Sequence, residues 1–177
     1  MNENASLFFV DRHVDSHIKE KKAFIEYGSN QKFITYADLH EQSSKLRHFF
    51  SKFKINREDR VIILMQDVIS YPIIFWGCLK SGVVPVLLNT LLSSEVVNDI
   101  INNSRAKAVF ISSGLLSSFE NSVKKNVSIK HIIEVGTKIS NYINFDEEIK
   151  KCSFQETINC SKDEIAFWLY SSGSTGQ

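Results

Sequence analysis

The residues with the clearest capacity for chemistry lie near the C-terminus, where serines, a threonine and glycines form one short run. These residues are Ser171, Ser172, Gly173, Ser174, Thr175 and Gly176. Glycines allow backbone conformations that turn amide N–H groups toward an anion. The hydroxyl groups add further donors. We therefore interpret the run as a loop that holds polyphosphate oxygens without a fixed positive charge.

Two other phosphate-binding motifs do not match this run. The Walker A pattern needs a longer glycine spacing followed by lysine, whereas Gly173 and Gly176 are three positions apart and no lysine follows. The dinucleotide pattern G-x-G-x-x-G also fails. A Ser/Gly-rich tail, which is common at chain ends, is the alternative that composition alone leaves open.

An apolar run, Ile165 to Tyr170, leads directly into residues Ser171–Gly176, which we call the Ser/Gly segment. This apolar run is predicted to be a strand. Similar runs occur at Arg60–Leu64, Val83–Leu88, Lys107–Ile111 and His131–Val135. Most are continuously apolar, which is typical of strands that are buried on both faces of a parallel sheet. Ligands bind beyond the carboxyl ends of such strands. The sequence therefore places the Ser/Gly segment where a ligand is expected.

Helical patterns lie between the predicted strands. Leu46, Phe49, Phe50 and Phe53 repeat with helical spacing, and the helix that carries them is predicted to begin with a capping pair, Thr35 and Asp38. Ser93 or Ser94 is predicted to cap the helix that carries Val96, Val97, Ile100 and Ile101. The alternation predicts an α/β fold, with a mostly parallel sheet covered by helices on both faces.

Two further segments have distinct patterns. The runs on either side of Gly28-Ser29-Asn30 are predicted to form a β-hairpin that precedes the sheet. The polar segment 138–162 is predicted to be a loop with a short helix around Phe145–Lys151.

Composition narrows the class of protein. The 177 residues carry a net charge of +1, which predicts one domain and gives no electrostatic basis for binding nucleic acid. Three cysteines without a C-x-x-C spacing favour a reducing cytoplasm over a disulfide framework. The apolar stretch Tyr71–Leu88 is interrupted by Lys80, Gly82 and Pro85, so we predict a buried helix and strand there and no membrane span.

Histidine and cysteine positions predict no metal site. His13 and His17 are four apart on a predicted helix, but no third ligand is evident, so surface or capping roles are expected. His40 has no recognisable partner in the sequence, and Cys78 is predicted to be a small buried apolar side chain.

The string "YSSGSTG" resembles the phosphate loop of the adenylate-forming superfamily, which includes acyl-CoA synthetases, peptide-synthetase adenylation domains and luciferases. The longer unit "AFWLYSSGSTG" resembles the benzoate–CoA ligase branch. The resemblance extends over essentially the whole chain through "FFVDRHVD", "AFIEYG", "TYADL", "EDRVIILMQD", "LKSGVVPVLLNTLL" and "SRAKAVFIS".

The resemblance implies an enzyme that uses ATP, Mg²⁺, coenzyme A and a small aryl carboxylic acid. The resemblance implies that Ser171–Gly176 bind the β,γ-phosphates of ATP, and that the Thr175 hydroxyl and the Gly176 amide are the main contacts. It implies no catalytic residue in this chain. It identifies the chain as the first αβ subdomain of the family's large N-terminal domain. In the family, the loop continues after one variable position, here Gln177, to a lysine. Residues 1–177 are therefore expected to be truncated inside that loop, without the second half of the domain or the mobile C-terminal domain.

Three functional hypotheses remain open from the sequence. The first is the N-terminal part of an aryl-acid CoA ligase, with the isolated chain inactive. The second is a non-catalytic remnant or split half that binds nucleotide weakly. The third is an unrelated nucleotide-binding α/β module. Because faces meant for a missing half are expected to be exposed, we also expect the isolated chain to form oligomers or to be poorly soluble.

Overall fold

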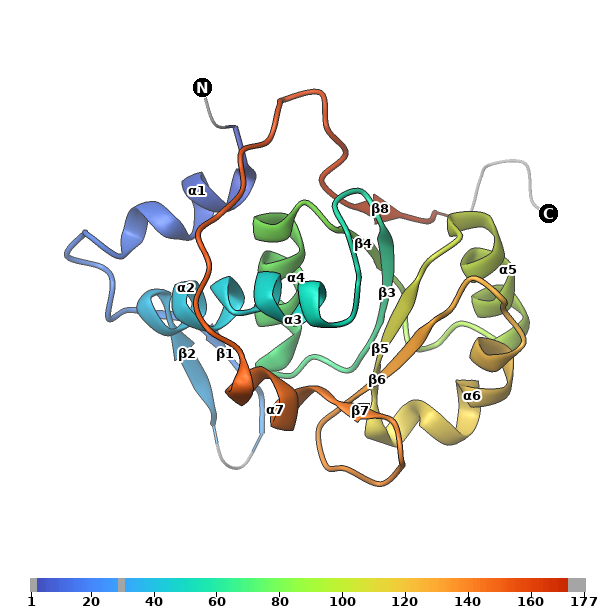
Figure 1. The fold of residues 1–177 in the computed structure, drawn as a ribbon. Helices are drawn as coiled ribbons and strands as arrows, with labels where there is room; N and C mark the ends of the chain where they lie inside the picture. The colour runs from blue at the N-terminus through green and yellow to red at the C-terminus, as the bar shows by residue number, and fades with distance from the viewer. Residues whose placement is uncertain (1–2, 29–30, 172–177) are drawn as a thin grey trace.

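The computed structural model describes residues 3–28 and 31–171, in which strands and helices alternate (Figure 1). The strands are β1 (Lys22–Ile25), β2 (Phe33–Thr35), β3 (Arg60–Leu64), β4 (Val84–Leu87), β5 (Ala108–Ser112), β6 (His131–Val135), β7 (Ile143–Asn144) and β8 (Trp168–Leu169). The α-helices are α1 (Ala5–Phe9), α2 (Tyr36–Ser44), α3 (Leu46–Lys52), α4 (Ser70–Ser81), α5 (Ser94–Ser104), α6 (Leu116–Lys124) and α7 (Phe145–Glu148). Short 3-10 turns are η1 (Asp11–His13), η2 (Ser113–Leu115) and η3 (Ile149–Lys151).

Six strands form one sheet in the order β7-β6-β5-β3-β4-β8, and every neighbouring pair is parallel. Successive side chains of β3 point to opposite faces of the sheet, as strand geometry requires. Val61 and Ile63 belong to the core beneath α3, α4 and α7, whereas Ile62 and Leu64 belong to the core beneath α5 and α6. The predicted parallel α/β fold with helices on both faces is confirmed.

Local capping signals set several helix ends. Thr35 accepts a hydrogen bond from the Asp38 amide and Asp38 accepts one from the Thr35 amide, which completes the predicted capping box of α2. The Ser93 hydroxyl accepts from the Val96 amide at 3.3 Å and caps α5. Gly82 ends α4 with a φ of 67°, in the left-handed region that favours glycine.

The single helix predicted after Thr35 is wrong, because the structure divides it into α2 and α3 at Lys45. The Ser43 hydroxyl donates to the Leu39 carbonyl at 2.6 Å, a contact that competes with the helical ladder. The Ser44 carbonyl accepts instead from the Gln155 amide at 3.1 Å. Tertiary contacts therefore divide a segment that has continuous helical periodicity.

The predicted hairpin is confirmed by the antiparallel pairing of β1 with β2. Ser29 and Asn30 of its turn lie outside the described residues. The helical part of segment 138–162 is also confirmed by α7 and η3, although no sequence pattern predicted the short strand β7.

The apolar stretch Tyr71–Leu88 forms most of α4 and all of β4, as predicted. Cys78 lies fully buried on α4, and burial raises the pKa of its thiol well above the usual value. Among the helices in residues 3–28 and 31–171, none has the length and apolarity needed to cross a bilayer.

Residues 152–167 connect η3 to β8 without a helix or strand of their own, and we call this segment the strap. In Figure 1 the strap runs from α7 past α2 and α3 and over the top of the molecule to β8. Its backbone is held by the Ile158 amide, which donates to the Lys80 carbonyl at 3.0 Å. The Arg47 guanidinium donates to the Glu156 carbonyl at 3.0 Å. The strap thus carries the chain from one edge of the sheet to the other.

A buried ion pair lies beneath the strap. Lys80 is 1% exposed, and its ammonium lies 2.6 Å from one oxygen of Asp11. His40 lies 2.9 Å from the same oxygen, so the expectation that His40 has no partner is wrong. The Lys80 ammonium also donates to the Ser44 hydroxyl at 2.8 Å. This cluster joins η1, α2 and α4.

The predicted helix that carries His13 and His17 is also wrong. Residues Asp11–His13 form a 3-10 turn, and His17 follows in a further turn. The His13 ring packs on the Tyr36 ring at a centroid distance of 4.6 Å. The two histidines therefore do not share one helical face.

An apolar groove of about 410 Å³ separates the hairpin from α4 and the end of β4. Its lining includes Phe24, Ile25, Pro72, Phe75, Trp76 and Leu87. Next to it, Phe75 meets Phe167 with ring centroids 5.6 Å apart, and Leu169 of β8 is 67% exposed. Apolar surface therefore continues from the groove to the open edge of the sheet.

We expect the isolated chain to self-associate through this surface, because exposed apolar patches and open sheet edges favour association. Ile25, which lines the groove, is 56% exposed, and Ile25→Lys is expected to lower the oligomer mass measured by light scattering. Val127, which is 89% exposed and does not line the groove, provides the control Val127→Lys. A parent chain that stays monomeric at all concentrations, or equal effects of both substitutions, would contradict the expectation.

Candidate functional site

The candidate site lies at the carboxyl edge of the sheet, where β8 ends beside β4. Trp168 pairs with Val86 and Leu169 pairs with Leu87 in parallel register. Both strands end at these positions, so Tyr170 and Ser171 emerge at the same edge. This is the edge at which open α/β sheets bind ligands.

The strand predicted over Ile165–Tyr170 is shorter than expected, because β8 contains only Trp168 and Leu169. β8 is an edge strand that pairs with β4 alone, and only at Val86 and Leu87. Ile165 and Phe167 remain exposed. Only the part of the run that lies opposite Val86 and Leu87 is strand.

β8 is held on both faces of the sheet. The Trp168 ring packs against the core beneath α5 and α6, with the Arg60 guanidinium 5.9 Å from the centre of the ring. On the opposite face, Phe167 packs edge-on against Phe75 of α4. These contacts contribute to the position of the strand that precedes the Ser/Gly segment.

Tyr170 forms a second connection immediately before that segment. Its hydroxyl donates to the Asn103 side-chain oxygen at 2.6 Å, which ties the chain to α5. Partial burial raises the pKa of Tyr170, so the hydroxyl keeps its proton and serves as a donor. Ser171 follows directly and is exposed.

Of the predicted phosphate-binding residues, the structure describes Ser171 alone. Ser172, Gly173, Ser174, Thr175 and Gly176 lie outside the described residues. The structure brings Ser171 to the predicted edge of the sheet. The phosphate-binding role of all six residues stays a prediction.

Other polar groups at this edge shape its loops. Ser112, the last residue of β5, accepts a hydrogen bond from the Gln66 amide at 3.0 Å. Asn89, just beyond β4, accepts from the Leu91 amide at 2.9 Å. These bonds stabilise the turns that leave β3 and β4.

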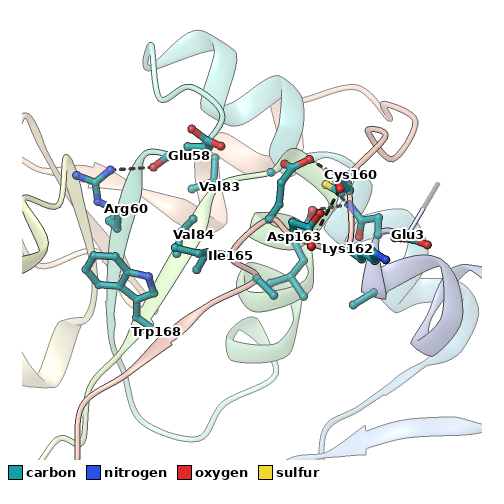
Figure 2. Close-up of a pocket in the computed structure, with 17 residues that line it drawn as sticks. Glu3, Glu58, Arg60, Val83, Val84, Cys160, Lys162, Asp163, Ile165 and Trp168 are labelled. Carbon is teal, nitrogen blue, oxygen red and sulfur yellow. Dashed lines mark hydrogen bonds between the residues drawn. The ribbon is translucent and has the colours of Figure 1, made fainter. Parts of the chain in front are cut away.

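A cavity of about 450 Å³ lies at the opposite end of the sheet, near the start of β3 and β4 (Figure 2). Figure 2 shows Arg60 and Glu58 on one side, with Cys160, Lys162, Asp163 and Glu3 on the other. The Arg60 guanidinium donates to the Ser104 carbonyl at 2.8 Å and the Glu58 carbonyl at 2.9 Å.

Charge argues against phosphate in this cavity. Four acidic side chains line it, Glu3, Glu58, Asp163 and Glu164, against two basic ones, Arg60 and Lys162. Glu164 is paired with Arg57, which still leaves more acidic than basic groups. Arg60 is already engaged by backbone carbonyls. The cavity also lies at the amino ends of the strands, whereas ligands of such sheets bind at the carboxyl ends. Its location and its excess of acidic groups therefore both argue against a phosphate site there.

Within residues 3–28 and 31–171, no group of three or more His, Cys, Asp or Glu side chains is arranged to hold a metal ion. The carboxyl edge described above offers hydroxyl, amide and phenol groups. Among the described residues, these groups can form hydrogen bonds with a ligand.

Sequence reasoning missed two supports of the site. Arg60 begins a predicted strand, but nothing in the sequence pairs it with Trp168. Tyr170 and Asn103 are 67 positions apart, so no local pattern predicts their hydrogen bond. The one signal in the sequence is that each apolar run has a polar residue at one end: Arg60 begins the first run, and Tyr170 ends the last.

The fold and its edge define the chain as an open parallel α/β domain of the type that binds ligands at the carboxyl ends of its strands. The particular family follows from its sequence. The profile of the AMP-binding enzyme family matches residues 10–177, and the chain belongs to this family.

Curated relatives include CoA ligases for aromatic acids. The 4-hydroxybenzoate–CoA/benzoate–CoA ligase of Rhodopseudomonas palustris is 31% identical over 179 residues, which cover 98% of this chain and 32% of that protein. The benzoate–CoA ligase of Thauera aromatica is 33% identical over 119 residues, which cover 67% of this chain and 22% of that protein. The chain thus spans a third or less of the length of these two relatives.

Solved structures of aryl-CoA ligases share the fold. The anthranilate CoA ligase AuaEII, in complex with anthranoyl-AMP, superposes with a TM-score of 0.89 over 99% of this chain at 21% identity, and 33% of that protein is covered. A benzoate CoA ligase from Burkholderia xenovorans LB400 superposes with a TM-score of 0.79 over 96% of this chain at 26% identity, with 32% of that protein covered.

Proposed function

We propose that the chain is the N-terminal part of an ATP-dependent aryl-acid CoA ligase. In the proposed reaction a carboxylate oxygen attacks the α-phosphorus of ATP, which gives an acyl-adenylate and pyrophosphate. The thiol of coenzyme A then attacks the acyl carbon, and AMP leaves. Two steps are needed because a carboxylate oxygen is a poor leaving group, whereas AMP is a good one.

The observation that carries the proposal is the placement of β8. This strand ends at the carboxyl edge of the sheet and leads directly from Tyr170 into the Ser/Gly segment. Backbone amides and hydroxyls there suit the β,γ-phosphates of ATP, and positioning them is the main contribution expected of a protein to phosphoryl chemistry. Mg²⁺ would offset the negative charge of the triphosphate.

We propose a benzoate-type acid as the substrate class. This finer assignment is supported by the two aromatic-acid ligases that are 31% and 33% identical to the chain. The acetyl-coenzyme A synthetase of Bacillus subtilis, whose name gives a different acid, is 29% identical over 179 residues. The groups that would contact the acid, adenine and coenzyme A are proposed to lie in the part of the relatives that this chain does not span.

We expect the purified chain alone to catalyse no benzoate-dependent exchange of pyrophosphate into ATP, because it contains only one side of the proposed phosphate site. The positive arm of the test is a chimera in which residues 1–177 replace the matched segment of the Rhodopseudomonas palustris ligase. This chimera is expected to show exchange that depends on benzoate or 4-hydroxybenzoate.

Paired substitutions at one position test the role of the loop in the chimera. Thr175→Ala is expected to lower exchange about 100-fold, the typical cost of removing a donor that stabilises developing charge. Thr175→Ser keeps the hydroxyl and is expected to remain near the parent rate. Exchange by the isolated chain above a buffer blank, or a folded chimera without exchange, would contradict the proposal.

A further inference from the structure

The strap presents a structural problem, because β8 must be placed accurately by a long segment that has no regular structure. Sixteen residues, 152–167, connect η3 to an edge strand of only two residues. β8 pairs with one neighbour, so the sheet alone holds it weakly. Whatever holds the strap therefore contributes to the position of Ser171.

One side chain of the strap reaches the buried ion pair. The Thr157 hydroxyl donates to the second carboxylate oxygen of Asp11 at 2.7 Å. The first oxygen of Asp11 receives the Lys80 ammonium at 2.6 Å. Asp11 therefore connects α4 to the strap through its two oxygens.

Lys80 holds the strap in two ways. Its ammonium acts through Asp11 on Thr157, and its carbonyl accepts from the Ile158 amide at 3.0 Å. Bonds to an ionised carboxylate are stronger than those between neutral groups, and a low local dielectric strengthens them further. Other bonds hold the strap at further points: the Gln155 amide donates to the Ser44 carbonyl at 3.1 Å, and the Arg57 guanidinium donates to the Glu164 carboxylate at 3.0 Å.

We propose that Asp11, Lys80 and Thr157 are positioning residues that fix the strap and thereby hold β8 and Ser171 at the carboxyl edge of the sheet. The importance of this edge for ATP rests on the proposed function. The anchoring itself does not, since it involves no nucleotide. A test without nucleotide therefore separates failure of the anchor from failure of the ligase assignment.

The first test uses fluorine NMR of the chain labelled with 5-fluorotryptophan. The sequence has two tryptophans, Trp76 on α4 and Trp168 on β8. Thr157→Val removes the hydroxyl but keeps the shape, and is expected to shift or broaden the Trp168 signal while that of Trp76 stays in place. Thr157→Ser is expected to retain the parent spectrum. An unchanged Trp168 signal in Thr157→Val would overturn the proposal.

The second test is hydrogen exchange of backbone amides. In the parent chain the Gln155 and Ile158 amides, which donate to the Ser44 and Lys80 carbonyls, are expected to be protected. Thr157→Val is expected to accelerate exchange of strap and β8 amides about tenfold, because the strap then opens more often, without acceleration in β5 and β6.

Three results of the exchange experiment would overturn the anchor. These are unprotected strap amides in the parent chain, no acceleration in Thr157→Val, and equal acceleration in all strands. The last result would show a general loss of stability. The measurement on the parent chain tests the anchor even if the Thr157→Val variant does not fold.

Discussion

Asp11→Asn is expected to lower the free energy of unfolding by about 3 kcal/mol, because it leaves a buried ammonium without its carboxylate. Lys80 is 1% exposed, and among the described residues Asp11 is the one acidic side chain in ion-pair contact with its ammonium. The remaining contacts, to Ser44 and His40, are not anionic. Urea denaturation followed by circular dichroism gives the measurement.

The double variant Asp11→Asn with Lys80→Met tests the cause. Methionine removes the unpaired charge and fills similar space, so it is expected to restore at least half of the lost stability. A double variant that is less stable than Asp11→Asn alone would show that shape, rather than charge, is the source of the loss.

The pH dependence of Asp11→Asn has a defined sign. In the parent, burial lowers the pKa of Lys80, and the hydrogen bond from Lys80 to Asp11 opposes that effect. Without the carboxylate the folded-state pKa falls further below the unfolded value of about 10.4, so the unfolded state binds more protons. Stability of Asp11→Asn is therefore expected to rise with pH in the alkaline range, more steeply than that of the parent.

Gly82→Ala is expected to lower the free energy of unfolding by about 2–3 kcal/mol, from two independent causes. The φ of Gly82 is +67°, where a Cβ is strained. A Cβ at this position would also clash with the Cδ1 atom at the end of the Ile158 side chain, which would have to move. Thermal unfolding in parallel with urea denaturation measures the loss.

Two variants separate these causes. Gly82→Asn introduces the same Cβ, but asparagine tolerates the left-handed region better, so an intermediate loss is expected. Gly114→Ala is the control, because nothing lies within 4 Å of its added Cβ and its φ is not in the left-handed region. It is expected to change stability by less than about 0.5 kcal/mol. Equal stability of Gly82→Ala and the parent would contradict the packing at this turn.

Much of the secondary structure followed from local patterns. The continuous apolar runs predicted β3, β5 and β6, because strands buried on both faces need no polar alternation. Thr35, Ser93 and Gly82 marked helix ends through bonds or dihedral angles within a few residues. The carboxyl-edge location of Ser171 also followed, since a parallel strand precedes it.

The sequence by itself therefore determined the fold class, the family resemblance and the strand that carries the proposed phosphate loop. Only the tertiary structure decided that β8 lies beside β4, that Tyr170 bonds to Asn103 and that Thr157 bonds to Asp11. The physical reason is that periodicity and capping depend on neighbouring residues, whereas these contacts join positions up to 146 residues apart. The sequence shows Lys80 only as a charged residue within an apolar run, and the folded structure shows that Asp11 is its partner.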